Sequence, residues 1–182
     1  MGQSWSGIRK RLEEDLLCEK LRGRVRYFIT KYRKAHDDEA RVAVVVDNRE
    51  VLKGNVFTFY REANPMINRL RKEENTPKRK WDGDKIINRE ANEAIEKRVD
   101  RILIDNGTVD TYLFTEALDF YMHHSIDESI ESSDALVRMF AILDRRIGKR
   151  RLRELTETIG EQPEWLQFFY RLRMESEGIR LD

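Results

Sequence analysis

Cationic and aromatic side chains alternate along one segment near the N-terminus of the sequence. Their spacing of two residues places them on one face of an expected strand: Arg22, Arg24, Arg26, Phe28, Tyr32 and Lys34. Arginines at this spacing can bind phosphates, and interleaved aromatic rings can stack on exposed bases, so the face is a candidate surface for a nucleic acid or another partner. The alternative is an outward strand face whose charges discourage edge pairing and whose arginines pair with nearby carboxylates.

A second group of cations surrounds Gly148. Its members are Arg145, Arg146, Lys149, Arg150, Arg151 and Arg153. Two helices joined at a glycine would suggest the helix-turn-helix way of reading DNA. That motif needs polar, base-reading residues in the first turns of its second helix, and here the residues are only cationic. Cations near a helix end also stabilise the helix dipole, so this group has a structural alternative as well.

The cluster Lys78-Arg79-Lys80-Trp81 lies in a segment, Asn75 to Gly83, that we expect to be a surface loop. A tryptophan beside three cations suits contact with a partner protein or a nucleic acid. The alternative is that Trp81 anchors the loop on the hydrophobic core.

Two adjacent histidines precede a group of acids, a combination that some metal sites use. The group consists of His123, His124, Asp127, Glu128 and Glu131. However, Ser125 and Glu128 have the spacing of a capping box, which predicts that one helix ends and another begins between the histidines and the acids. A metal site also needs three or four convergent ligands, and no second Glu-x-x-His follows. We therefore predict no metal and no cofactor.

A polar loop between two expected strands contains the remaining candidates for acid–base chemistry: His36, Asp37, Asp38 and Glu39. Cys18 would be a conceivable nucleophile beside His36, although no local signature surrounds it. Turn chemistry explains the polar loop without any reaction. No convergent catalytic set is recognisable, and we predict no catalytic residue.

Length and composition limit the classes of protein to which the chain can belong. The 182 residues suit one domain, and 35 basic residues nearly balance 34 acidic ones, which excludes a uniformly basic coat for nucleic acid. A single cysteine, Cys18, excludes a disulfide framework. No run of about 18 apolar residues predicts a membrane span, and the N-terminus has no apolar signal region. We expect a cytosolic protein without membrane contact.

The apolar pattern predicts an α+β fold with a sheet-containing part at about 22–56. A helix over Ser4 to Leu21 is followed by a strand over Arg24 to Lys34. The run Val42 to Val46 is apolar on both faces, which favours a central strand. A turn at Asp47-Asn48 leads to a third strand over Glu50 to Lys53, ended by Gly54. The prediction is a three-stranded antiparallel sheet with the valine strand in the middle.

The helical part occupies the rest of the chain, about 57–182, within one domain over 1–182. Because a proline is tolerated only in a first turn, the helix before Glu74 should start at about Glu62, near Pro65. Asp84 should cap a long helix that stops at Asn106-Gly107. Asp110 starts the next helix, with Tyr112 among its inward-facing residues. Further helices are expected from Ser125, over Ala135 to Ile147, over Lys149 to Ile159, and from Pro163.

Several patches of the sequence resemble an uncharacterised family of small bacterial proteins. They include Ala141 to Leu152, Phe168 to Arg173 and shorter N-terminal segments such as Leu21 to Arg24. The resemblance covers nearly the whole chain and is weakest over Gly54 to Gly83. It implies a bacterial, cytosolic, stand-alone protein, and it transfers no catalytic residue.

The sequence therefore favours a non-enzymatic cytosolic accessory protein that binds another macromolecule through its charged surface. One alternative is a nucleic-acid-binding protein that uses the basic strand face and the Arg145–Arg153 cluster. The other is a hydrolase with an unrecognised site near His36 or His124. The partner, whether protein or nucleic acid, and the oligomeric state are left open.

Overall fold

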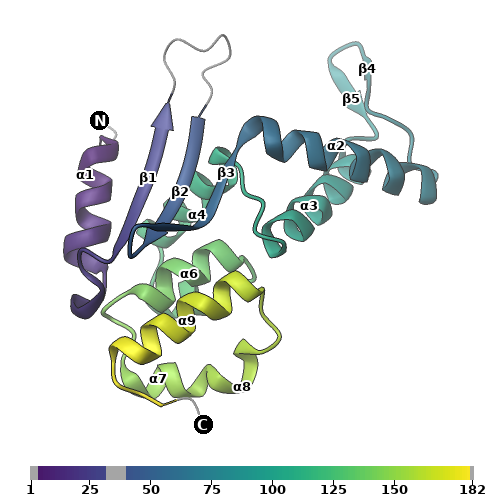
Figure 1. Cartoon of the computed structure of the whole chain (residues 1–182). Coiled ribbons are helices and arrows are strands. Elements are labelled where there is room, and N and C mark those ends of the chain that lie inside the picture. The colour runs from purple at the N-terminus through teal and green to yellow at the C-terminus, as the bar shows by residue number, and fades with distance from the viewer. Residues whose placement is uncertain (1–3, 32–39, 181–182) are drawn as a thin grey trace.

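A computed structural model describes residues 4–31 and 40–180, and it contains the predicted antiparallel sheet (Figure 1). The strands β1 (Val25–Lys31), β2 (Ala40–Val46) and β3 (Arg49–Asn55) follow one another in the order β1-β2-β3. All five residues of the valine run are buried in β2, because this strand has a neighbour on each side and is covered on both faces. Mostly helical structure follows the sheet, so the predicted α+β class and the central valine strand are confirmed.

The predicted turn between β2 and β3 is also present. Val46 pairs with Arg49, so the connection consists of Asp47 and Asn48 alone. Both residues have positive φ, 48° and 65°, which is the backbone of a type I′ hairpin turn. Aspartate and asparagine tolerate this left-handed conformation better than most side chains, which explains why the signal was readable from the sequence.

The third strand runs one residue beyond Gly54, which was predicted to end it. A Cβ atom at Gly54 would lie 1.6 Å from the carbonyl oxygen of Val109, so only glycine allows the two backbones to approach. The glycine therefore marks a close contact between the sheet and the segment that precedes α4.

The prediction of one continuous helix from Ser4 to Leu21 is wrong. The structure has α1 (Trp5–Lys10), a π-helical turn over Arg11–Leu16 and a 3₁₀ turn over Glu19–Leu21. The chain leaves the helix at Leu17 because this residue forms an isolated β-bridge with Asp144, and the amide of Cys18 donates to the carbonyl of Leu143 at 2.9 Å. Tertiary hydrogen bonds thus replace helical ones after Leu16.

Two helices and a hairpin form an arm beside the sheet, and we call residues 56–105 the arm. It contains α2 (Val56–Glu73), β4 (Lys80–Asp82), β5 (Lys85–Ile87) and α3 (Arg89–Asp105). In Figure 1 the arm extends away from the sheet, with the hairpin at its far end.

Two predictions about the arm are wrong. Helix α2 starts at Val56, capped by the side chain of Asn55, and includes Pro65. The proline is tolerated because it lies on the exposed face, where water can reach the carbonyl that lacks an amide donor. Asp84 caps no helix, since it belongs to the turn between β4 and β5, and most of the predicted loop before Gly83 leads into this hairpin.

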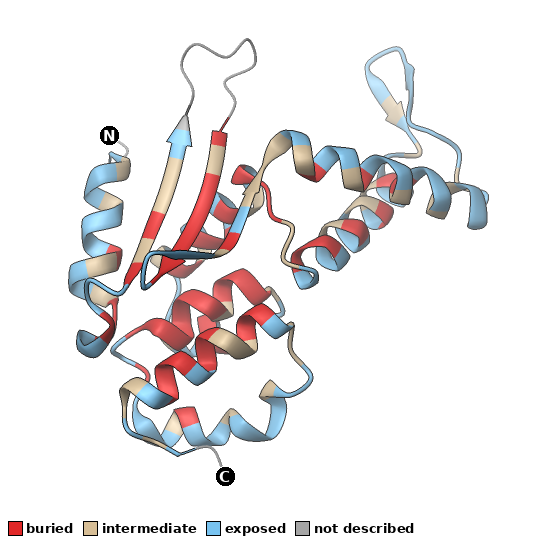
Figure 2. Ribbon diagram, in the orientation of Figure 1, coloured by how far each residue is buried: buried red, intermediate tan, exposed pale blue. Residues whose placement is uncertain are grey.

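The remaining helices are α4 (Thr111–His123), α5 (Ile126–Glu131), α6 (Ala135–Leu143), α7 (Lys149–Glu154), α8 (Thr156–Ile159) and α9 (Glu164–Ser176). Helix α6 ends at Leu143 and not at Ile147, because Asp144 turns into the bridge with Leu17. The helix predicted over Lys149 to Ile159 is divided at Leu155. Helices α6 and α9 are mostly buried (Figure 2).

Two hydrophobic clusters hold these elements. The larger one joins the sheet to α4, α6 and α9. The smaller one lies within the arm and contains Phe59, Ala63, Ile67, Ile95, Val99 and Leu103. Leu113 of α4 packs against both, so the start of α4 is the place where the arm meets the rest of the fold.

Candidate functional site

Two arginines of the basic strand face are bound by the turn between β2 and β3. Arg24 donates to both carboxylate oxygens of Asp47, at 2.9 and 2.7 Å, and the guanidinium of Arg26 donates to the side-chain oxygen of Asn48. Arg26 also lies 5.9 Å from the ring centre of Phe28, while Arg22 is exposed. Tyr32 and Lys34, the other members of this face, lie outside the described residues. The contacts favour the structural alternative for the described part of the face.

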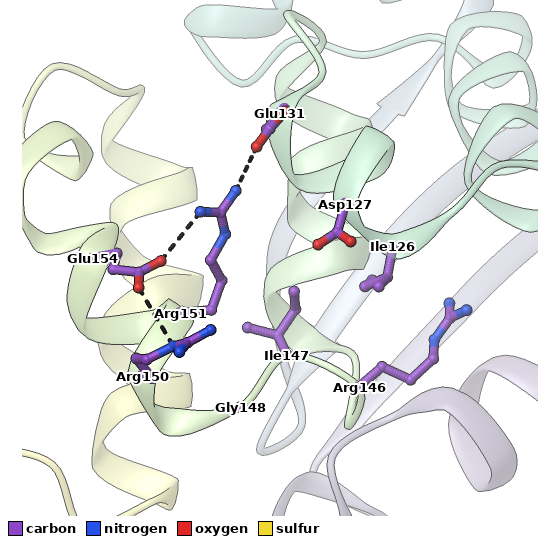
Figure 3. Close-up of a pocket in the computed structure, with 9 residues that line it drawn as sticks. All are labelled: Ile126, Asp127, Glu131, Arg146, Ile147, Gly148, Arg150, Arg151 and Glu154. Atoms are coloured by element: carbon purple, nitrogen blue, oxygen red, sulfur yellow. Dashed lines mark hydrogen bonds and ion pairs between the residues drawn. The ribbon is translucent and has the colours of Figure 1, made fainter.

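Three of the cations near Gly148 line a cleft of about 470 Å³ beside α5 and α7 (Figure 3). Arg151 bridges two carboxylates, Glu131 at 2.5 Å and Glu154 at 3.1 Å, and Arg150 lies 3.6 Å from Glu154. Asp127 adds a third carboxylate, so the three arginines of the lining face three acids. A cleft with balanced charge offers little attraction to a phosphate.

The third arginine of that lining, Arg146, is held by Asp144. Asp144 is buried, and it accepts hydrogen bonds from the Tyr121 hydroxyl and from the backbone and guanidinium of Arg146, the last at 2.7 Å. The hydrogen bond with Asp144 raises the pKa of Arg146, while burial raises the pKa of Tyr121. This set of contacts fixes the turn between α6 and α7, which is a structural role.

The other cations of the group are dispersed. The Lys149 ammonium donates to the carbonyl of Glu177 at 2.9 Å, and the side chains of Arg145 and Arg153 are exposed. Helix α7 has six residues, which is too short for the recognition helix of a helix-turn-helix motif. The structure thus brings Arg146, Arg150 and Arg151 to one cleft without creating a cationic surface there.

The arm hairpin, which we define as residues 78–87, presents the third predicted cluster. Trp81 is 71% exposed and Lys78 and Lys80 are exposed, while Arg79 pairs with Glu96 at 2.6 Å. The alternative in which Trp81 anchors the segment on the core is wrong. An exposed tryptophan at the end of a projecting arm is typical of a contact residue, because tryptophan dominates the energy of many interfaces.

The two histidines are not part of a shared site with the acids that follow. The ring of His124 stacks on Phe120 with 3.7 Å between ring centres, and the chain then turns into the predicted capping box of Ser125 and Glu128. The Nδ1 atom of His123 lies 2.8 Å from the carbonyl oxygen of Asp119. Among residues 4–31 and 40–180, no group of three or more His, Cys, Asp or Glu is arranged to hold a metal ion.

Cys18 is a buried free thiol. Its sulfur accepts a hydrogen bond from Arg173 at 2.9 Å and donates one to Glu177 at 3.3 Å. Arg173 lowers the pKa of Glu177, to which it also donates. The polar loop of His36, Asp37, Asp38 and Glu39 lies outside the described residues, so the proposed pairing of Cys18 with His36 stays a hypothesis.

A cleft that the sequence did not reveal lies where the arm meets α4. It has a volume of about 430 Å³ and is lined by residues of α2, α3 and the start of α4, and we call it the arm cleft. Two tyrosines border it, Tyr60 at 47% and Tyr112 at 67% exposure. The sequence pattern placed Tyr112 inward, which is wrong: its neighbours on α4, Thr111 and Phe114, are the buried ones.

The charged lining of the arm cleft is unbalanced. Its cations, Arg71 and Arg79, are both engaged by Glu96, at 3.3 and 2.6 Å. Three further carboxylates line the cleft, and within the described part of the chain none of them has a cationic nitrogen within 4 Å: Asp100, Asp110 and Glu116. The cleft therefore has more carboxylates than cations, and both of its cations are already paired with Glu96.

The pKa values of the lining reflect this crowding. Partial burial, followed by the negative charges of Asp110, Glu96 and Glu116, raises the pKa of Asp100 to about 6. Burial raises the pKa of Asp110 against the opposing effect of the backbone amides of Leu113 and Tyr112. Burial and then Asp110 and Asp100 raise the pKa of Tyr60. The site holds partly desolvated negative charge beside exposed aromatic rings, and both features attract a cationic side chain.

Comparison with known proteins places the chain in a family. Residues 4–174 match the SF0329 protein family, which is nearly the entire length. The chain belongs to the SF0329 protein family. This confirms the resemblance to an uncharacterised family, while the bacterial origin of its members stays a prediction. No curated protein and no solved structure matches the chain. Within the described residues, every helix is too short or too polar to cross a bilayer.

Proposed function

We propose that this member of the SF0329 family is a non-enzymatic accessory protein of the cytosol, and that its arm cleft binds a basic segment of a partner protein. One observation carries the proposal: in the described chain, where arginines such as Arg24, Arg146 and Arg151 have carboxylate partners, Asp100, Asp110 and Glu116 share a cleft without a cation of their own. A lysine or arginine from outside would supply the missing charge.

The aromatic residues of the cleft support the same conclusion. Tyr60 and Tyr112 are exposed enough to contact a guanidinium or ammonium group, and a cation against an aromatic face contributes about 0.5–2 kcal/mol, more as water is removed. The carboxylates favour a basic peptide over a neutral one. The exposed rings favour a peptide over a free cation, because a peptide makes a larger contact with them.

The other two hypotheses have less support. A nucleic acid would meet repulsion from the acids of the arm cleft, and three of the arginines proposed to contact it, Arg24, Arg146 and Arg151, are paired with carboxylates. A hydrolase needs a nucleophile and a base within hydrogen-bond reach. The described candidates, Cys18 and His124, are engaged by Arg173 and Phe120 respectively.

The experiment is a binding assay with a fluorescein-labelled peptide that contains two arginines separated by serine and glycine. Its partner peptide has citrulline in place of arginine, which keeps the shape and removes the charge. We expect fluorescence anisotropy to show at least about tenfold tighter binding of the arginine peptide, and a loss of about tenfold in the Asp100→Asn/Glu116→Gln variant. The matched control is Glu157→Gln, an exposed acid on α8, far along the chain from the arm.

Equal binding of both peptides, or equal binding by the wild type and the cleft variant, would refute the proposal. Salt separates the hypotheses further. If the protein bound heparin or single-stranded DNA with a steep loss of affinity as salt increased, while the arginine peptide did not bind, the nucleic-acid hypothesis would replace this one.

A further inference from the structure

The arm hairpin carries an excess of positive charge, whereas the lining of the arm cleft carries an excess of negative charge. Residues 78–87 contain four cations and two carboxylates, a net charge of +2. Lys78, Lys80 and Lys85 take part in no ion pair among the described residues. Trp81 pairs with Ile86 across the hairpin and extends into solvent, so one exposed aromatic side chain stands among cations.

The arm cleft offers the complement of each of these features. Two carboxylates that have no ion pair among the described residues, Asp100 and Glu116, reach its surface, the N-cap carboxylate of Asp110 lies buried behind them, and two tyrosines are exposed. Indole and phenol rings form favourable offset or edge-to-face contacts, and lysine beside carboxylate adds attraction of opposite charges.

The arm keeps these two surfaces at different places in the same chain. Arg79, at the base of the hairpin, already pairs with Glu96 at the edge of the cleft, and β4 then leads outward. In Figure 1 the hairpin stands at the far end of the arm, while α4, which carries Tyr112 and Glu116, lies at the near end. Helix α3 leads from the hairpin toward α4, and its cleft residue Asp100 lies 11 residues, about 16 Å of helix, beyond the first residue Arg89.

We propose that the basic segment received by the arm cleft is the arm hairpin of a second copy of this chain. The inference rests on the proposed function of the cleft and names its occupant. Two arms side by side in opposite directions place each hairpin at the cleft of the other copy. The contact is two-fold, uses the same surfaces twice and closes after two chains, so it gives a dimer and not a filament. Each cleft is complete only when the partner contributes Trp81 and its neighbouring lysines.

The first test is the mass in solution of the full chain, measured by sedimentation equilibrium over a range of concentrations. We expect a dimer with a Kd on the order of 10 µM or tighter, weakening as salt increases. Trp81→Ala, which removes an exposed side chain and leaves the fold intact, should weaken the dimer by at least about tenfold. The matched control is Glu157→Ala, which changes an exposed residue of α8 and should leave the mass unchanged.

A charge exchange tests the pairing itself. One variant carries Lys78→Glu/Lys80→Glu, and the other carries Asp100→Lys/Glu116→Lys. Each variant alone sets like charges against each other at both contacts and should be monomeric. In an equimolar mixture, the acidic hairpin meets the basic cleft and the basic hairpin meets the acidic cleft, so both contacts of a mixed dimer are restored. Circular dichroism of each variant establishes that it is folded.

The outcomes separate this inference from the proposed function. A monomeric wild type that still binds the arginine peptide would overturn the inference and leave the proposed function in place. A dimer that survives Trp81→Ala and both charge variants would show another interface and would also overturn the inference. If the wild type neither dimerises nor binds the peptide, both proposals fail.

Discussion

Replacing Asp100 by asparagine should stabilise the protein at neutral pH. The pKa of this carboxyl is raised from about 3.8 to about 6, first by partial burial and then by the negative charges of Asp110, Glu96 and Glu116. A rise in pKa from 3.8 to about 6 corresponds to about 3 kcal/mol of unfavourable free energy in the ionised, folded state. Because Asp100 is only partly buried, screening by solvent reduces this value, and we expect a gain of about 1 kcal/mol.

The sign of the pH dependence follows from linkage. The folded state binds the proton more tightly than the unfolded state, so the folded protein loses stability as the pH rises from about 4 to about 6. Asparagine has no such titration. The advantage of Asp100→Asn over the wild type should therefore be complete above about pH 6 and should disappear as the pH falls toward 4.

The assay is urea denaturation of both proteins from pH 4 to 7.5, in a Trp81→Ala background so that docking of the arm hairpin does not contribute. At pH 7.5 we expect the free energy of unfolding obtained from the urea curves to rise by about 1 kcal/mol. Asp15→Asn, an exposed aspartate near the N-terminus, is the matched control. A variant that is less stable than the wild type at pH 7.5, or a difference that is constant across the range, would refute the reasoning about the arm cleft.

Two further predictions concern structural contacts. Gly54→Ala should destabilise the fold by roughly 3 kcal/mol in chemical denaturation, because its Cβ would lie 1.6 Å from the Val109 carbonyl oxygen. The control Gly160→Ala, with open space around it, should change the free energy of unfolding by less than about 0.5 kcal/mol. Asp144→Asn should cost about 2 kcal/mol, because it leaves Arg146 without its carboxylate; a change below about 0.5 kcal/mol would argue against a structural role for this pair.

The parts of the fold that were predictable depend on local signals. The composition of the run Val42–Val46 predicts a central strand, and Asp47-Asn48 predicts a turn because both residues tolerate positive φ. The capping box at Ser125 was readable for the same reason, since its partners are three residues apart. In each case the cause of the structure lies within a few residues of its effect.

The errors have tertiary causes. Pro65 fits inside α2 because its face of the helix is exposed, and the break after Leu16 exists because Leu17 pairs with Asp144, which is remote in the sequence. The hairpin of β4 and β5 has mostly exposed residues, so no apolar alternation marked it.

The arm cleft was missed for a related reason. Asp100 belongs to α3, while Tyr112 and Glu116 belong to α4 and Tyr60 to α2, and spacing within any one helix says nothing about their meeting. The local hint was the i,i+4 placement of Tyr112 and Glu116 on one face of α4. The same spacing is typical of a solvated helix face, so the cleft becomes recognisable only when the arm packs on α4.

The contrast between the two kinds of charge in this protein is the basis for the functional argument. Arg24, Arg146 and Arg151 looked functional in sequence, and in the structure each has a carboxylate within hydrogen-bond distance. Such pairs satisfy their own charges and leave little for a partner. For Asp100 and Asp110 the balance is reversed, because folding raises their pKa values and neither carboxylate has an ion pair among the described residues. Asparagine at position 100 would remove this cost, so stability of the fold does not account for the carboxylate there, whereas binding of a cationic partner does.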